Sequence, residues 1–239
     1  MRASPSSPLA GALCSLEGLS VGDAFGERFF VDPGLAAALI HQRVVAEPPW
    51  RYTDDTEMAL SIVSVLTAHG EIEQIQLASS FAEHHDWSRG YGAGMHSLLI
   101  RIGVGAPWER EAQRQFGGQG SFGNGAAMRV APIGAYFADD LDRVVEQARR
   151  SAVVTHAHPE GVAGAIAVAV AAALARRLHD TAKEVEPRGF LESAIASVPD
   201  SEVRDGIRRA TELREGSTVH EAAAALGNGT RVSAQDTVP

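Results

Sequence analysis

Cysteine is nearly absent from this chain of 239 residues, which contains a single one, Cys14. One thiol cannot form an intramolecular disulfide, and a zinc site built from several cysteines is excluded as well. Basic residues are outnumbered, since 21 Lys and Arg stand against 30 Asp and Glu, and the formal net charge is −9. An acidic chain lacks the electrostatic footprint of a general nucleic-acid binder. From the charge we therefore expect no nucleic-acid partner. From the single cysteine we expect that the protein does not reside in an oxidising compartment.

Long apolar runs are missing too. The nearest candidate, residues 161–175, is shorter than the ~20 residues that a membrane span needs, and it ends at Arg176. We interpret it as a buried core helix and expect no membrane partner. Residues 1–9 contain one basic residue and no long apolar stretch, unlike a secretory signal. We expect residues 1–8 to form a disordered tail and the protein to be cytoplasmic.

Apolar residues recur with the helical period in several segments, whereas sustained period-2 alternation is nearly absent. Residues 56–69 are typical, with Met58, Ile62 and Val65 on one face and Gly70 as a stop signal. The pattern predicts an all-α fold, an irregular bundle of about eight to ten helices in a single domain over residues 9–239. Further helices are expected from near Leu9 to a closing segment at residues 22–27, over residues 75–84, 141–154, 158–178, 190–198 and 202–213, and from a Thr218–Glu221 capping box to Leu226, with Gly227 as C-cap.

Two long stretches, residues 32–52 and 103–125, lack such a pattern and are interrupted by Pro or Gly. We expect both to be irregular. Loops of this length inside a compact domain tend to carry function.

The segment Tyr-Thr-Asp-Asp-Thr, residues 52–56, stands at the start of a predicted helix. One interpretation is capping, with Asp54 as N-cap and Glu57 completing a capping box. The other is a site for Mg²⁺ or Mn²⁺, because hard cations prefer oxygen ligands. The doubled acid favours the metal, since one carboxylate is enough for a cap.

Residues 117–125 contain five glycines. They fit a G-x-G-x-x-G pattern, but no apolar strand precedes them and no P-loop lysine is present. Glycines at this density allow backbone N–H groups to approach an anion or a ribose closely. The alternative is a flexible turn.

Three other clusters have both structural and functional interpretations. The segment 155–160 contains His156 at the start of the central helix, where Thr155 could cap or the histidine could hold a phosphate or sugar. Residues 83–86 look like a metal cluster but fit a solvated helix face better. In residues 22–27, Asp23 is expected to cap or orient a neighbour, and Glu27 is a catalytic carboxylate or a solvent-exposed one.

The order of these motifs resembles the ADP-ribosylglycohydrolase family. The resemblance runs from about Leu9 to the end of the chain and includes two further motifs, Arg-Gly-Tyr-Gly at 89–92 and Gly-Asn-Gly-Ala-Ala-Met-Arg-Val-Ala-Pro at 123–132. It implies an all-α fold with a binuclear Mg²⁺ or Mn²⁺ centre, and hydrolysis of a glycosidic bond at C1″ of ADP-ribose. The implied metal ligands are Thr53, Asp54 and Asp55. We expect Asp55 and, as the acid nearest to the family's catalytic position, Glu27 to be the catalytic carboxylates. The implied substrate-binding residues are Gly120, Ser121, Phe122, Gly123, Asn124 and His156.

Two departures from the family pattern bear on activity. Family members carry a catalytic or gating Glu four residues after the glycine that matches Gly26, and that position is Phe30 here. A C-terminal Asp-x-Asp-Thr motif that supplies further metal ligands is missing, and Asp236 is no substitute because it lacks a paired acid. We therefore interpret the chain as a C-terminally shortened member. We expect weak or single-metal binding, reduced activity and an exposed face on the central helix over residues 162–174.

The leading hypothesis is a metal-dependent hydrolase acting on ADP-ribosylated protein side chains or small ADP-ribose conjugates. The alternative is a catalytically impaired module that binds ADP-ribose or a nucleotide. The sequence leaves open which linkage is cut and what the oligomeric state is.

Overall fold

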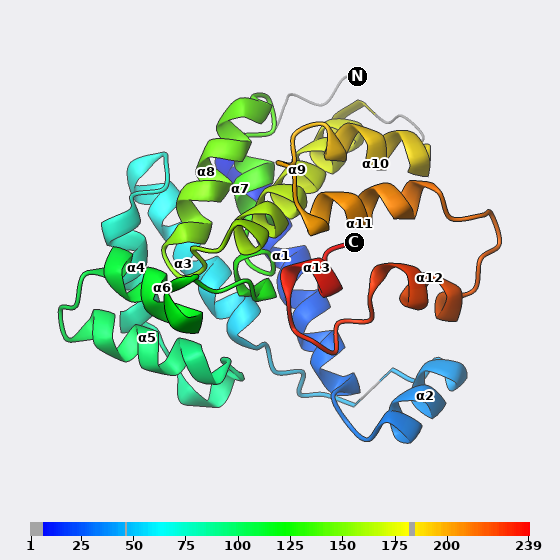
Figure 1. Cartoon of the computed structure of the whole chain (residues 1–239), viewed down its shortest axis with the longest axis horizontal. Coiled ribbons are helices and arrows are strands. Elements are labelled where there is room, and N and C mark those ends of the chain that lie inside the picture. Colours follow the sequence, from blue (N-terminus) through cyan, green and yellow to red (C-terminus); the bar gives the residue numbers. More distant parts are fainter. Residues whose placement is uncertain (1–6, 46, 182–184) are drawn as a thin grey trace.

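The computed structural model describes residues 7–45, 47–181 and 185–239. Within these residues it contains thirteen α-helices, three short 3₁₀ helices and no β-strand, which confirms the all-α prediction (Figure 1). The α-helices are α1 (Pro8–Gly26), α2 (Pro33–Gln42), α3 (Asp54–His69), α4 (Gln74–Glu83), α5 (Ala93–Gly103), α6 (Trp108–Gly118), α7 (Ala131–Tyr136), α8 (Leu141–Val153), α9 (Pro159–Thr181), α10 (Pro187–Ile195), α11 (Glu202–Thr211), α12 (Val219–Leu226) and α13 (Ala234–Thr237). The 3₁₀ helices are η1 (Glu27–Phe29), η2 (Trp87–Arg89) and η3 (Asn124–Ala126).

The helix α9 is the centre of the bundle. It packs against α7, α8, α10, α11 and α13, so the face that we expected to be exposed is covered. Ala163, Ala165 and Ala169 are fully buried. At Gly134 in α7, a Cβ would lie 1.9 Å from the carbonyl oxygen of Ala169, so α7 can cross α9 this closely only with glycine at that point.

Residues Pro159–His179 of α9 have the length and composition of a membrane span, with a mean hydropathy of 1.6. The apolar run in the sequence is shorter than this helix, because the helix continues past the run through the arginines at 176 and 177. Half of this window is buried inside the protein. Its packing is that of the predicted core helix.

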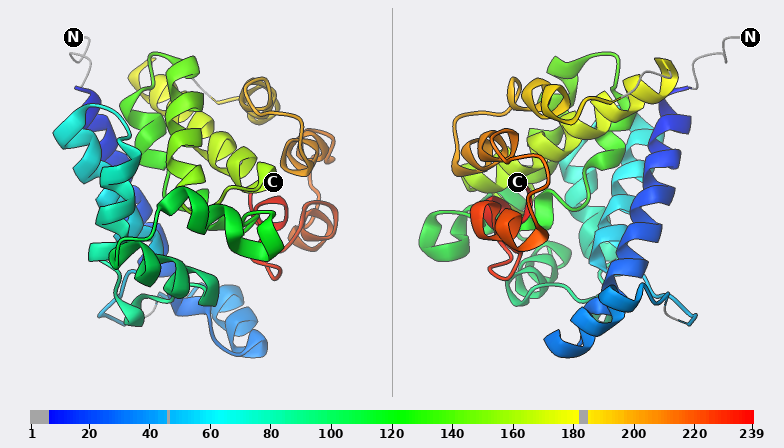
Figure 2. Two further views of the ribbon diagram at one scale, coloured as in Figure 1. Left: turned by 60° about the vertical axis from the view of Figure 1, so that its left-hand side comes forward. Right: turned by 90° about the vertical axis from the view of Figure 1, so that its right-hand side faces the viewer.

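A second layer is formed by α1, α3 and α7. Figure 2 shows α1 running alongside α3, and a small separate cluster of Ala12, Leu16, Ala59 and Val63 fills the space between these two helices. The packing brings the C-terminal end of α1 to the N-terminus of α3, where the acidic motif begins.

Several predicted helix ends are confirmed. Gly70 is the left-handed C-cap of α3, and Thr218 and Glu221 form the capping box of α12, which ends at Gly227. The predicted tail is wrong at its last residue, because Pro8 already belongs to α1; residues 1–6 lie outside the described part. The bundle has more helices than we expected. The two stretches predicted to be irregular contain α2 and α6, and α5, α7 and α13 were not predicted either.

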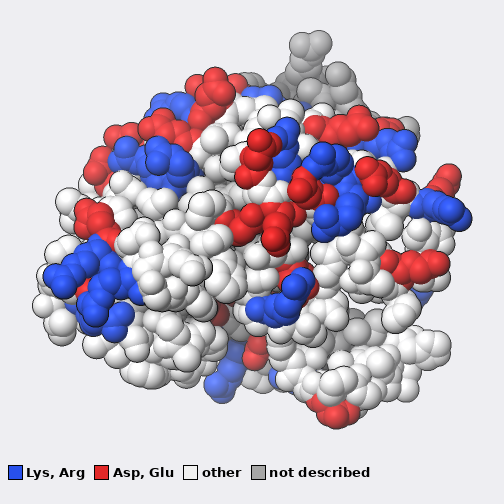
Figure 3. All heavy atoms as spheres, viewed as in Figure 1, with Lys and Arg blue, Asp and Glu red and all other residues white. Residues whose placement is uncertain are grey.

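Local capping explains the helix in the first of these stretches. Asp32 accepts hydrogen bonds from the backbone N–H groups of Gly34 and Leu35, and Pro33 occupies the first helical position. The resulting α2 has no buried residue, and Ile40 is 63% exposed. On the face drawn in Figure 3, acidic and basic side chains are interspersed elsewhere, whereas the region of α2 carries few charges.

Candidate functional site

A cleft of about 1080 Å³ lies where α1, α3, the 90–95 segment, the glycine-rich loop and the C-terminal segment meet. Nine of the ten predicted site residues line it: Glu27, Thr53, Asp54, Asp55, Ser121, Phe122, Gly123, Asn124 and His156. Gly120 does not; it packs against the backbone of Ala157 and His158 at φ +79°, which leaves no room for a Cβ. The tertiary fold thus brings together predicted site residues as far apart in the sequence as Glu27 and His156.

The acidic motif is held at the start of α3 by Asp23 of α1. One carboxylate oxygen of Asp23 accepts from the backbone N–H of Thr53 at 2.8 Å and of Thr56 at 3.2 Å. The hydroxyls of Thr53 and Thr56 each donate to Asp23 at 2.6 Å. Asp23 therefore orients the helix start, as one interpretation of its motif predicted. The predicted N-cap was wrong, because Thr53 and not Asp54 takes that position.

Glu57, the other half of the predicted capping box, faces a different partner. It accepts from the hydroxyl of Tyr91 at 2.7 Å and from the backbone N–H of Asp86 at 3.2 Å. Arg89 donates to the carbonyl of Tyr52 at 3.0 Å. The Arg-Gly-Tyr-Gly motif thus stabilises the first turn of α3 through contacts that do not involve Asp23.

The electrostatics of this helix start favour a cation. Burial, together with the neighbouring charges of Asp55 and Asp23, raises the pKa of Asp54 from 3.8 to about 7. Burial and the charge of Asp23 also raise the pKa of Asp55. Two carboxyls that are desolvated and repel one another are stabilised as anions by a bound cation.

The donor set fits a divalent cation in part. The Thr53 hydroxyl donates its proton to Asp23, so its oxygen keeps a lone pair for a cation. The carboxylates of Asp54 and Asp55 offer further oxygen ligands. Within residues 7–45, 47–181 and 185–239, however, no group of three or more acidic, His or Cys side chains converges as a metal cluster. A Mg²⁺ ion here would keep several waters, as that ion commonly does.

Glu27 lies in η1 and Phe30 follows directly after it, and both line the cleft. Glu27 stands on the same side as the acidic motif, since its charge raises the pKa of Asp55. Phe30 is 84% exposed at the position where the family pattern has Glu. Glu27 is thus an exposed acid of the cleft wall, as one interpretation predicted, and it lies in a 3₁₀ turn where a loop was expected.

The glycine-rich loop is closely packed from Gly120 onward, whereas Gly117 and Gly118 have open space around them. A Cβ at Gly125 would lie 2.8 Å from the His156 ring, and a Cβ at Gly161 would lie 2.8 Å from the Ser121 carbonyl oxygen. The loop also pairs with the C-terminal segment, because Asn124 N–H donates to the Val232 carbonyl at 3.1 Å. These glycines are needed for close approach to the start of α9.

Two aromatic rings stand at this end of the cleft. Phe122 belongs to the loop, and Phe116 is placed by a break in α6, where its φ is +50°. The ring centroids are 4.8 Å apart. The sequence pattern gave no reason to pick Phe116, because its position depends on that break.

His156 is buried at the floor of the cleft. The predicted cap at Thr155 is wrong, since α9 begins at Pro159 and Thr155 is itself fully buried. Burial and the charge of Arg129 lower the pKa of His156 to about 3. Arg129, a fully buried cation, belongs to the 123–132 motif, but no role in the site was predicted for it from the sequence.

The predicted cluster at residues 83–86 has another arrangement. His85 Nε2 lies 2.8 Å from Nδ1 of His96, and Trp87 stacks on the His96 ring with centroids 4.2 Å apart. His85 is half-buried, so the interpretation as a fully solvated face is wrong for it.

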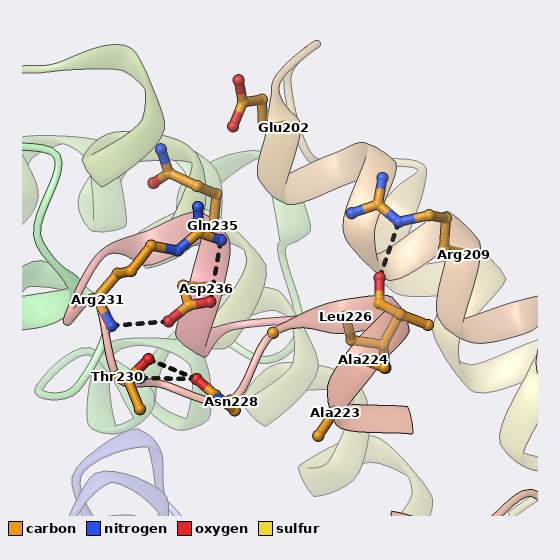
Figure 4. Close-up of a pocket in the computed structure, with 12 residues that line it drawn as sticks. Glu202, Arg209, Ala223, Ala224, Leu226, Asn228, Thr230, Arg231, Gln235 and Asp236 are labelled. Carbon is orange, nitrogen blue, oxygen red and sulfur yellow. Dashed lines mark hydrogen bonds and ion pairs between the residues drawn. The ribbon is translucent and has the colours of Figure 1, made fainter. Parts of the chain in front are cut away.

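A smaller hollow of about 330 Å³ lies between α11, α12 and α13 (Figure 4). Arg231 pairs there with Asp236 at 3.0 Å, and Arg209 donates to the Ala225 carbonyl at 3.3 Å. Its two cations are thus engaged by its own walls. Arg231 also lines the main cleft, so this ion pair fixes part of the cleft wall.

Comparison with known proteins agrees with the all-α fold. The sequence profile of the family described as ADP-ribosylglycohydrolase matches residues 5–239. The chain therefore belongs to the ADP-ribosylglycohydrolase family.

Individual relatives fall in the same family. ADP-ribosylhydrolase ARH3 of Homo sapiens is 32% identical over 211 residues, which cover 79% of this chain and 56% of that protein. ARH3 of Gallus gallus is 38% identical over 162 residues, covering 64% of this chain and 41% of that protein. The ADP-ribosyl-[dinitrogen reductase] glycohydrolase of Rhodospirillum rubrum is 30% identical over 165 residues, covering 62% and 52%. The chain spans about half the length of these relatives.

Proposed function

We propose that this chain is a divalent-metal-dependent hydrolase that cleaves the C1″ glycosidic bond of ADP-ribosylated side chains or of small ADP-ribose conjugates. The observation that carries the proposal is the composition of one cleft. It joins a desolvated acid pair at one end to a glycine-rich loop and two aromatic rings at the other. The family membership supports the same chemistry.

Each chemical group of ADP-ribose would contact a different part of the cleft. Aromatic faces stack on nucleobases, so we expect the adenine at Phe116 and Phe122. The closely packed loop around Gly123 offers backbone N–H groups to the pyrophosphate. The ribose with the scissile bond then reaches Asp54 and Asp55 at the start of α3.

The acid pair would hold the metal together with Thr53. When bound, a divalent cation would polarise ribose oxygens and a water and would offset the substrate's negative charge, which matters for an acidic protein. The carboxylates of Asp55 and Glu27 are the groups that would take the proton of the attacking water or return one to the leaving group. Phe30 beside Glu27 would limit the access of bulk water.

The second candidate is a module that binds ADP-ribose without cleaving it. One observation favours it: among the described residues no complete metal cluster is present. Phe30 at the position of the family's Glu points the same way. Binding would then persist without turnover.

The test is calorimetry and turnover on the same preparations. ADP-ribose is titrated into the chain with and without millimolar Mg²⁺, and ADP-ribose release is followed from arginine-linked, serine-linked and O-acetyl conjugates. We expect Mg²⁺-dependent binding and turnover, and a loss of at least about 100-fold in turnover for Asp55→Asn. Asp139→Asn is the matched control, because Asp139 is exposed and does not line the cleft.

The outcomes separate the candidates. Full Mg²⁺-dependent turnover of Asp55→Asn would refute the role of Asp55. Metal-independent binding with no turnover on any conjugate would support the binding module, and no binding in either condition would refute both.

A further inference from the structure

A buried arginine lies behind the glycine-rich loop. Arg129 has no exposed surface, and its Nη2 donates to the Thr155 hydroxyl at 2.8 Å and to the Ser151 carbonyl at 2.9 Å. The guanidinium also lies over the Phe81 ring, 4.5 Å from its centroid. Its Nη1 donates to the sulfur of Met58 at 3.4 Å, and Met58 lines the cleft. The side chain is therefore held from several sides, and it does not itself line the cleft.

The contact with Arg129 determines what the Thr155 hydroxyl can do. A guanidinium is a donor only, so this hydroxyl must accept from it. The same oxygen lies 2.7 Å from Nδ1 of His156. Its single proton has no other acceptor among the hydrogen bonds of the described residues, so it is donated to Nδ1.

This direction sets the tautomer of the imidazole. A neutral ring that accepts at Nδ1 carries its proton at Nε2. The neutral form is the one present at neutral pH, because burial and Arg129 lower the pKa of His156 to about 3. Nε2 is therefore a hydrogen-bond donor.

The glycines of the loop leave room for that donor. A Cβ at Gly123 would lie 3.3 Å from Nε2 of His156, and a Cβ at Gly125 would lie 3.0 Å from the same atom. His156 lines the cleft although it is only 3% exposed. The Nε2–H edge is thus the part of the ring on the side of the glycine-rich loop, where the proposed ligand would lie.

We propose that Arg129 and Thr155 are positioning residues that hold His156 as a neutral Nε2–H donor toward an oxygen of the ligand bound on the glycine-rich loop. The identity of that ligand rests on the proposed function, whereas the tautomer does not. The order Arg129, Thr155, His156 is a chain of donors that starts at a permanent charge, and such a chain polarises its last member.

The tautomer is measured directly, without ligand. The full chain is labelled with ¹⁵N, and one long-range ¹H–¹⁵N spectrum at neutral pH resolves the nitrogens of its histidine rings. The His156→Gln variant assigns the ring by the loss of its signals. We expect a pyrrole-type Nε2 and a pyridine-type Nδ1 for His156. A protonated Nδ1 in the parent chain would overturn the proposal without recourse to any variant.

The role of the relay is tested at Thr155. Thr155→Val keeps the shape but removes the hydroxyl, and Thr155→Ser keeps the hydroxyl. We expect the valine variant to lose the fixed tautomer and to weaken ADP-ribose binding about 5- to 20-fold, and the serine variant to keep both close to the parent. A purely structural role of Thr155 would leave the His156 nitrogens unchanged in Thr155→Val, and that result would refute the relay.

The two proposals can fail separately. If His156 carries Nε2–H and the chain binds no ADP-ribose, the tautomer assignment is supported and the proposed ligand is refuted. If ADP-ribose binds and His156 carries its proton at Nδ1, the proposed function survives and the relay is refuted.

Discussion

Replacing Asp23 with alanine tests the idea that α1 holds the acidic motif in place. The carboxylate accepts four hydrogen bonds, two from the backbone and two from the hydroxyls of Thr53 and Thr56. Loss of a helix cap costs about 1 kcal/mol, and each hydrogen bond to a charged group contributes about 1.5–3 kcal/mol. The sum is reduced because water can enter from the cleft and because repulsion with Asp54 and Asp55 is relieved. We expect a net loss of about 2–4 kcal/mol in the free energy of unfolding.

The assay is urea unfolding followed by circular dichroism, with EDTA present so that metal binding does not contribute. Asp23→Asn is expected to fall between the alanine variant and the parent, because an amide offers one acceptor oxygen where the carboxylate offers two. Asp32→Ala is the matched control. It removes the cap of α2, a helix without any buried residue, so global stability should change by less than about 0.5 kcal/mol. Equal losses for Asp23→Ala and Asp32→Ala would refute the reasoning.

The remaining predictions concern charge, packing and stacking. The pKa of Asp54 is about 7 in the folded protein and 3.8 in the unfolded chain, so between these values the folded state binds more protons. In EDTA, the free energy of unfolding should therefore fall as pH rises from 3.8 to about 7. At pH 7.5 Asp54→Asn should therefore raise the melting temperature in EDTA and abolish any rise caused by Mg²⁺; a lower melting temperature in EDTA would contradict the shift. Gly134→Ala should cost more than about 3 kcal/mol because its Cβ meets the backbone of α9, whereas Gly18→Ala, with open space around it, should be neutral or stabilising in urea unfolding. Phe122→Ala should weaken ADP-ribose binding in calorimetry by about 1–3 kcal/mol, and unchanged affinity would place the adenine elsewhere.

Local patterns predicted most of the secondary structure. The helical period located α3, α4, α8, α9 and α11 to within a few residues, because each has an apolar face and clear ends. The pattern failed for α2 and α6. Helix α2 has no buried residue, and α6 reaches the core mainly through Trp108 and Ala112. Proline and glycine in the surrounding sequence therefore outweighed a weak apolar period.

Some site residues could likewise be predicted from local sequence, whereas the partners of others could not. Thr53, Asp54 and Asp55 are adjacent in the sequence, and the doubled acid marked them as candidates. Asp23 was recognised as an orienting residue, but its target was not, because the two lie 30 residues apart and meet only when α1 packs on α3. Glu57 was assigned to a local box, yet its partner is Tyr91, 34 residues away.

The composition, the helical period and the motif order depend only on the linear sequence. They determined the all-α class, the family and the identity of the acid pair. The tertiary structure decided which groups meet. Glycine is required at 123 and 125 because of a histidine ring about thirty residues further along, and that ring is oriented by a buried arginine. Such contacts depend on how helices pack, and packing is set by the shape of side chains that come together from distant parts of the chain.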